Sequence, residues 1–245
     1  MNALDDPSRI DTLRHIIKKK RSLKLFYEEI YLGYACCLER CPPGTALELG
    51  SGGGFVKEVI PRMVTSDILP YEGLDTVVDA TALPFPDDTL ALICMLNVFH
   101  HIPNVPRFLD EARRCLVRGG RILMIDQHPG WISTPILKYC HHESFDPRAR
   151  DWTFESSGPL SGANGSLAWI VFQRDYQTFQ ALFPNLILQR YEPCYPLRYW
   201  LIGGLKSWTL MPPLLYRPIA FLEHFLLRLS RRFGSFVEIE LVKQC

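Results

Sequence analysis

A glycine-rich turn follows the first short apolar run of this 245-residue chain. Residues 46–49 (Ala-Leu-Glu-Leu) predict a buried strand, and Gly50-Ser51-Gly52-Gly53-Gly54 comes next. Phe55 to Met63 then predicts a short helix. Glycines in such a turn let the backbone pass close to a ligand, and amides at a helix start point toward it. We therefore expect this turn to bind a ligand.

Two side chains beside the turn indicate the charge of that ligand. A dinucleotide fingerprint would need glycine or alanine at position 55, where this chain has Phe55, so a pyrophosphate is disfavoured. Glu48 would repel a phosphate, but it suits a sulfonium cation that bears an ammonium group. The ligand is therefore expected to be positively charged at one end.

Two further acids follow the next predicted strands. Asp67 comes 17 residues after Gly50, where a carboxylate can accept both hydroxyls of a ribose. Asp79-Ala80 ends the third strand, where a carboxylate can accept a hydrogen bond from an adenine amino group. Each acid alone could be an ordinary strand-end turn residue. Together they predict a nucleoside at the other end of the ligand.

These residues resemble the core of the class I methyltransferases, in particular the small-molecule methyltransferases. The resemblance covers residues 45–126 through motifs that occur in the same order. The matching segments are Glu48 to Gly54, Asp67, Asp79 to Asp88, Asn97 to Ile102, and Leu116 to Gly120.

The resemblance implies an S-adenosyl-L-methionine cofactor, with S-adenosyl-L-homocysteine as product. It also implies a seven-stranded sheet whose last strand runs antiparallel. The cofactor-binding residues it implies are Glu48, Gly50, Ser51, Gly52, Gly54, Asp67, Ile68, Asp79, Ala80 and Asn97. The chain departs from the family because only Leu69 to Asp75 separates the second and third strands. We expect the N-terminal helices to cover that side of the cofactor instead.

Methyl transfer needs an aligned acceptor, and an oxygen or nitrogen nucleophile can also need a general base. His100, just past the fourth strand, is the first candidate base, and His128, just past the fifth, is the second. The alternative for His100-His101 is a purely structural role. No metal is expected at His141-His142-Glu143, since adjacent histidines do not share one face of an element.

The pattern of elements predicts an α/β fold with a doubly wound, mostly parallel sheet. Residues 7–40 read as helical, with a basic bend or solvent-exposed face at 18–21. The seven predicted strands are 46–49, 64–68, 76–79, 90–96, 121–126, 186–191 and 235–242, and helices are expected over 106–116 and 174–183.

This pattern divides the chain into a methyltransferase core with additions on either side. The predicted parts are an N-terminal helical extension (1–44), the core (45–192) with a lid-like loop (127–170), an apolar helical insert (193–234) and the last strand (235–245).

The insert, residues 193–234, indicates what kind of methyl acceptor to expect. Leu222, Phe225 and Leu229 lie on one helical stripe, with arginines mostly off it. Such a helix can lie at a membrane surface, or it can pack on the sheet or on a second subunit. We expect a small-molecule or lipid- or glycan-linked acceptor, and peripheral membrane contact through 193–234. The sequence does not indicate an oligomeric state.

Composition limits the partners and the localisation that we expect. Lysine plus arginine (27) nearly balances aspartate plus glutamate (26), so no nucleic-acid partner is expected. No signal peptide and no cysteine framework is visible, which favours a cytoplasmic protein, in part peripheral to the membrane. A non-catalytic module that binds S-adenosylmethionine stays open, as does, less favourably, a nicotinamide-dependent oxidoreductase.

Overall fold

The computed structural model describes residues 6–156, 158 and 162–244. Parts of three predicted segments lie outside the described residues: 1–5 of the extension, 157 and 159–161 of the lid-like loop, and Cys245. No helix within the described residues is long and apolar enough to cross a bilayer.

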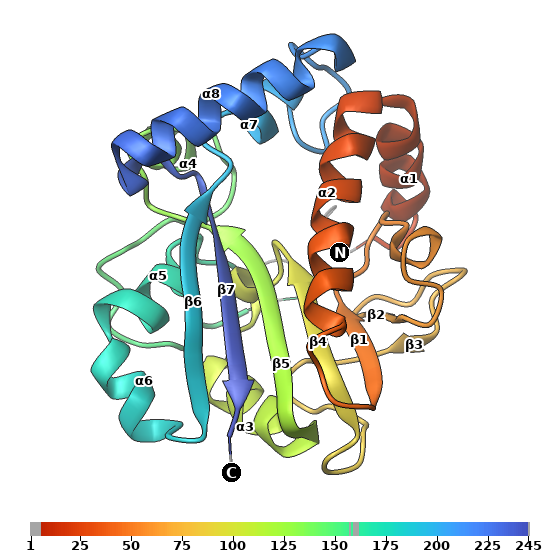
Figure 1. Ribbon diagram of the computed structural model, residues 1–245, viewed down its shortest axis with the longest axis vertical. Coiled ribbons are helices and arrows are strands. Elements are labelled where there is room, and N and C mark those ends of the chain that lie inside the picture. The colour runs from red at the N-terminus through yellow and green to blue at the C-terminus, as the bar shows by residue number, and fades with distance from the viewer. Residues whose placement is uncertain (1–5, 157, 159–161, 245) are drawn as a thin grey trace.

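A seven-stranded sheet forms the centre of the molecule, in the order β3-β2-β1-β4-β5-β7-β6 (Figure 1). Its strands are β1 (Thr45–Leu49), β2 (Val64–Asp67), β3 (Thr76–Val77), β4 (Leu90–Leu96), β5 (Leu116–Gln127), β6 (Leu186–Cys194) and β7 (Phe236–Lys243). Neighbouring strands are parallel, except that β7 runs antiparallel to both β5 and β6. The predicted α/β fold, with its antiparallel last strand, is confirmed.

Helices cover both faces of the sheet and its upper edge in Figure 1. The α-helices are α1 (Arg9–Lys19), α2 (Arg21–Leu38), α3 (Val105–Cys115), α4 (Ser133–Tyr139), α5 (Leu167–Trp169), α6 (Tyr176–Leu182), α7 (Arg198–Ile202) and α8 (Tyr216–Leu229). A π-helical turn, Ile170–Arg174, joins α5 to α6. Short 3₁₀ turns occupy Val56–Glu58, Phe99–His101, Pro213–Leu215 and Arg231–Phe233.

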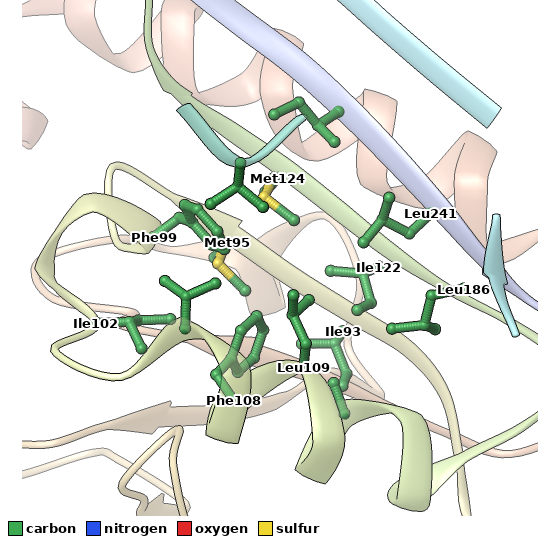
Figure 2. Close-up of a cluster of buried hydrophobic side chains, with 14 of the residues drawn as sticks. Ile93, Met95, Phe99, Ile102, Phe108, Leu109, Ile122, Met124, Leu186 and Leu241 are labelled. Carbon is green, nitrogen blue, oxygen red and sulfur yellow. The ribbon is translucent and has the colours of Figure 1, made fainter. Parts of the chain in front are cut away.

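On one face, α3 packs against the central strands. Figure 2 shows Phe108 and Leu109 of α3 beside Ile93 of β4. Phe99 and Ile102, which flank the turn after β4, are buried in the same cluster. Because these two apolar side chains anchor the turn, the histidines between them are held at a fixed place beyond the end of β4.

On the other face, α2 supplies the apolar stripe that its sequence predicts. Leu23, Phe26, Ile30 and Tyr34 are all at most 1% exposed, and they belong to the cluster that includes Cys94 of β4. This packing supplies far more stabilisation than helix propensity alone, since a fully buried Leu, Ile or Phe contributes about 1.5–3 kcal/mol.

Two local predictions were wrong. The helix expected over Phe55 to Met63 is only the 3₁₀ turn Val56–Glu58, because α2 packs on the face of the sheet that such a helix would cover and Pro61 interrupts the segment. The fifth strand begins at Leu116 rather than at residue 121, since Leu116 already pairs with Leu90 before a bulge.

The N-terminal extension takes over the space left by the missing helices. A Cβ atom on Gly53 would lie 2.9 Å from Cβ of Leu13 in α1. The guanidinium of Arg14 donates to the carbonyl of Glu72, between β2 and β3, at 2.7 Å. The prediction that N-terminal helices cover this side of the site is therefore consistent with the packing.

Ionic groups join the insert to α2. Arg198 of α7 binds Glu29 of α2 (2.7 and 3.0 Å) and Glu223 of α8. Lys20, at the break between α1 and α2, is 7% exposed and donates to the carbonyls of Gly204 (2.7 Å) and Lys206 (3.0 Å). Lys20 thus marks the predicted bend, but it is buried by the insert rather than solvated.

Candidate active site

The carboxyl ends of four neighbouring strands meet at one cavity of about 700 Å³. Glu48 of β1, Asp67 of β2, Asp79 after β3 and Asn97 after β4 all line it. The order of strands reverses between β1 and β4, and open α/β sheets bind ligands at such a reversal. Further predicted residues on the wall are Gly50, Ser51, Gly52, Ile68 and Ala80.

The glycine turn is held tightly against its neighbours. Gly50 has a φ of +67°, and a Cβ atom there would lie 2.3 Å from Cγ2 of Val98. Gly54 does not line the cavity, and a Cβ atom on it would lie 2.3 Å from the hydroxyl of Tyr31. Larger residues would displace the turn from the cavity.

Oε2 of Glu48 and Oδ1 of Asn97 are buried on the cavity wall and have no hydrogen-bond partner. Burial raises the pKa of Glu48 to about 7, a rise that Asp67 reinforces and the Ser51 hydroxyl opposes. Asn97 has a φ of +54°, a conformation that costs energy in residues other than glycine. An unsatisfied buried oxygen costs about 1–3 kcal/mol, so both residues fit a ligand that donates hydrogen bonds.

The two later acids are held by backbone donors. The buried Asp67 accepts from the amides of Gly52 (3.0 Å) and Leu69 (3.2 Å). Burial raises its pKa, although these hydrogen bonds oppose the rise. Asp79 accepts from the amide and the hydroxyl of Thr81, each at 2.7 Å. A carboxylate offers about four lone pairs, so each acid can still accept from a ligand.

A family model described as a methyltransferase domain matches residues 47–124, the segment that supplies these acids and the turn. Over this segment the chain is similar to a methyltransferase domain. The curated relative "Uncharacterized methyltransferase YcgJ" of Bacillus subtilis is 27% identical over 128 residues, which are 44% of this chain and 51% of that protein. The matched region therefore spans about half the length of this relative.

Solved structures show the same fold. One is described as "Complex between the Haloferax volcanii Trm112 methyltransferase activator and the putative methyltransferase"; it has a TM-score of 0.53 at 14% identity over 95% of this chain and 98% of the other. Another is geranyl diphosphate C-methyltransferase of Streptomyces coelicolor, in complex with Mg²⁺, geranyl diphosphate and S-adenosyl-L-homocysteine. Its TM-score is 0.52 at 16% identity, over 89% of this chain and 78% of the other.

S-adenosylmethionine, the cofactor that the sequence predicts, fits the cavity. The two unpartnered oxygens of Glu48 and Asn97 suit the cationic end of the cofactor, while Asp67 and Asp79 are placed to accept from a nucleoside. The nicotinamide-dependent alternative has no support from the family match.

Aromatic rings from the extension, the insert and β7 also line the cavity. Tyr199 and Phe236 pack edge to face with their centroids 4.9 Å apart. Burial raises the pKa of Tyr199 to about 12, so its hydroxyl stays neutral. The aromatic residues of this wall are Tyr27, Tyr31, Tyr199, Trp200, Trp208 and Phe236.

A polar cluster lies on the same wall. Nδ1 of His100 contacts Asp126 at 2.6 Å, while its Nε2 lies 3.2 Å from Glu143. Nε2 of His101 lies 3.4 Å from the other oxygen of Glu143. Burial opposes a charge on His100, but the two carboxylates together raise its pKa to about 10. Burial also opposes the charge on Glu143, yet the histidines lower its pKa overall. The cluster therefore attracts positive charge.

His128, the second predicted base, lies elsewhere. Its Nδ1 is 3.0 Å from the hydroxyl of Tyr191 in β6, and it is not among the residues that line the cavity. Burial lowers its pKa to about 4, so its ring is neutral.

Sequence reasoning missed several wall residues. Glu143 comes from the long loop after β5, and its distance along the chain from His100 gives no periodic signal. Tyr27 and Tyr31 were predicted only as part of a helix. The aromatic content of the insert was the available signal for Tyr199 and Trp208.

Proposed function

We propose that this methyltransferase methylates an apolar, lipid-linked acceptor that it takes from an anionic membrane surface. The single observation that carries the proposal is the orientation of α8. This helix buries Glu223 and exposes four of its apolar side chains, the reverse of a helix that packs only on its own protein; these are Phe221, Leu222, Phe225 and Leu229.

The proposal assigns the ends of the cofactor to the residues described above. Glu48 and Asn97 receive its ammonium end, Asp67 its ribose hydroxyls, and Asp79 with Ala80 its adenine. The side chain of Ile68 and the backbone of Gly50, Ser51 and Gly52 pack along it, while Gly54 holds the turn against Tyr31. The geometry that supports these roles is the shared cavity edge and the two unpartnered oxygens.

When bound, S-adenosylmethionine supplies the methyl group: a lone pair of the acceptor forms the new bond, and the electrons of the broken sulfur–carbon bond stay on sulfur. The protein contributes alignment and exclusion of water. Of the two predicted histidines, we place His100 beside the acceptor because it lines the cavity. We assign His128 a packing role against Tyr191.

The exposed stripe of α8 argues against packing on the sheet. Phe221 is 77% and Leu229 63% exposed, whereas Glu223 is 2% exposed and paired with Arg198. Figure 1 shows α8 lying across the edge of the sheet at which β5 ends. Further exposed apolar residues of this region are Leu210, Leu214, Leu215, Leu222 and Phe225.

The charges around this face are complementary to an anionic membrane. Residues 205–234 contain five lysines and arginines and one acid, the buried Glu223. Arg217 and Arg228 of α8 are exposed. Each basic residue near an anionic leaflet contributes about 1 kcal/mol, and apolar side chains add to this when they enter the interface.

The cavity reaches this surface. Trp208 lines the cavity and is nevertheless 46% exposed, and it lies in the segment between α7 and α8. An acceptor with an apolar chain could therefore pass from the membrane into the aromatic part of the cavity without crossing water.

Vesicle sedimentation tests the membrane step. The protein should sediment with vesicles that contain phosphatidylglycerol, and the double variant Phe221→Asp/Phe225→Asp should lower partitioning at least about tenfold, because two aromatic side chains leave the interface. Leu182→Asp is the matched control, since Leu182 is an exposed apolar residue of α6. Equal binding of the double variant and the control would contradict the proposal.

A further inference from the structure

We propose that His100, His101 and Glu143 form a binding site for one divalent transition-metal ion, for which Zn²⁺ is the probe. Nε2 of each histidine and the carboxylate of Glu143 all lie within 4.8 Å of one another at the cavity wall. The site is separate from the acids assigned to the cofactor.

The separations between these atoms fit metal ligands. Zinc binds imidazole nitrogen and carboxylate oxygen at about 2.1 Å in tetrahedral sites, which places neighbouring ligand atoms about 3.4 Å apart. In the protein, Nε2 of His100 and of His101 lie 3.2 and 3.4 Å from the two oxygens of Glu143. Two imidazoles and one carboxylate suit a transition metal better than Mg²⁺ or Ca²⁺, which prefer oxygen ligands.

Both histidines are oriented as metal-binding histidines usually are. Nδ1 of His100 is held by Asp126 at 2.6 Å, and Nδ1 of His101 by the carbonyl of Gly162 at 3.0 Å. A carbonyl oxygen only accepts, so Nδ1 of His101 carries the proton. In metal sites the second ring nitrogen commonly donates to a carboxylate or carbonyl in this way. Both Nε2 atoms are thereby turned toward Glu143.

The two histidine rings lie side by side, with their centroids 4.2 Å apart, and both direct Nε2 at the carboxylate of Glu143. A single divalent ion satisfies all three groups at once.

An unpartnered oxygen nearby also points to a ligand. The side-chain nitrogen of Gln127 donates to Glu143 at 3.1 Å, but its buried Oε1 has no hydrogen-bond partner. Gln127 is 5% exposed and lines the cavity. Its oxygen can accept from a water bound to the ion.

A second grouping, His141, His142 and Glu143, is a weaker candidate. Nδ1 of His141 already accepts from the backbone amide of Glu143 at 3.2 Å, and the side chain of His142 is 59% exposed. The expectation from sequence considered only these adjacent histidines, whereas the favoured site combines residues from two segments.

The three protein ligands leave coordination positions for the cavity. This consequence rests on the proposed function: an acceptor hydroxyl bound there would lose its proton more readily, because a bound cation lowers the pKa of a coordinated hydroxyl. His100 would then act as a ligand. The metal site itself stands whether the acceptor is a lipid or not.

Calorimetric titration of chelator-treated protein with Zn²⁺ alone tests the site. We expect one equivalent to bind, and Glu143→Gln and His101→Ala each to weaken binding by more than the roughly 10–100-fold expected for Asp126→Asn. His224→Ala, on exposed α8, should bind as the parent does. Co²⁺ should give visible absorption bands that disappear in the same variants.

The outcomes separate the site from folding defects and from the proposed function. Each variant should still bind S-adenosylhomocysteine, which shows that the core is folded. The proposal is overturned if the parent binds no Zn²⁺, if binding persists in both Glu143→Gln and His101→Ala, or if it is lost in His142→Ala but kept in His101→Ala. Membrane binding and methyl transfer are measured separately, so failure of the metal site would leave the proposed function standing.

Discussion

Glu48 combines burial, a missing hydrogen-bond partner and a place in the cofactor cavity. Its raised pKa means that the native protein binds more protons than the unfolded chain between about pH 4.5 and 7. The contribution of Glu48 to stability therefore falls as pH rises through that window. A cationic ligand favours the ionised carboxylate and would lower its pKa again.

This linkage makes cofactor binding depend on pH. Affinity for S-adenosylhomocysteine should rise about five- to tenfold from pH 6 to 7.5, as the fraction of ionised Glu48 in the free protein increases. Glu48→Gln should bind more weakly at pH 7.5, with a flat profile, and its unliganded form should be more stable there than the parent. Titration calorimetry and thermal unfolding at both pH values measure this. A pH-independent affinity in the parent would contradict the assignment of Glu48.

Several site residues could be predicted one by one from the sequence, and others could not. Glu48, Asp67, Asp79 and Asn97 follow strands of a recognisable order, so the sheet itself brings them together. Glu143 belongs to a loop, and only tertiary packing places it opposite His100.

At the scale of elements, the periodic pattern of α2 was sufficient to predict both the helix and its buried face, because its apolar stripe is buried throughout. The segment after the glycine turn has an equally apolar pattern, yet it forms only a 3₁₀ turn, since α2 already occupies that face. A sequence pattern indicates that a segment has an apolar face, but it does not indicate which of two such segments forms the helix that covers the sheet.

For α8, too, the sequence shows an apolar stripe but not which way the stripe faces. Its apolar stripe was visible in the sequence, but its orientation is set by Glu223. This carboxylate accepts from the amides of Leu197 (2.7 Å) and Arg198 (2.6 Å) and pairs with the Arg198 guanidinium. One buried polar contact thus turns the apolar stripe outward.

Removing that contact should destabilise the insert. Glu223→Leu leaves the amides of Leu197 and Arg198 and part of the Arg198 guanidinium without partners, so the free energy of unfolding should fall by about 3 kcal/mol. Arg228→Gln, on the exposed face of the same helix, should change stability by less than about 0.5 kcal/mol. Chemical denaturation of the two variants measures the difference, and equal stabilities would show that Glu223 does not hold α8.

At the scale of the whole molecule, three parts of the chain share one cavity. The core supplies the cofactor edge, α2 supplies Tyr27 and Tyr31, and the insert supplies Tyr199 and Trp208. Lys20 and Arg198 connect the N-terminal extension to the insert by a hydrogen bond and an ion pair. The aromatic part of the cavity therefore exists only in the assembled chain, while the family match covers residues 47–124 alone.

The direct test of the account is transfer of a labelled methyl group. The protein is incubated with methyl-labelled S-adenosylmethionine and a cell lysate, which is then separated into organic-soluble and aqueous fractions. We predict protein-dependent label in the organic fraction, and none with Gly50→Val, whose side chain would collide with Val98. Label confined to aqueous metabolites would contradict the lipid-linked acceptor, and cofactor binding without transfer to any fraction would contradict the enzymatic account itself.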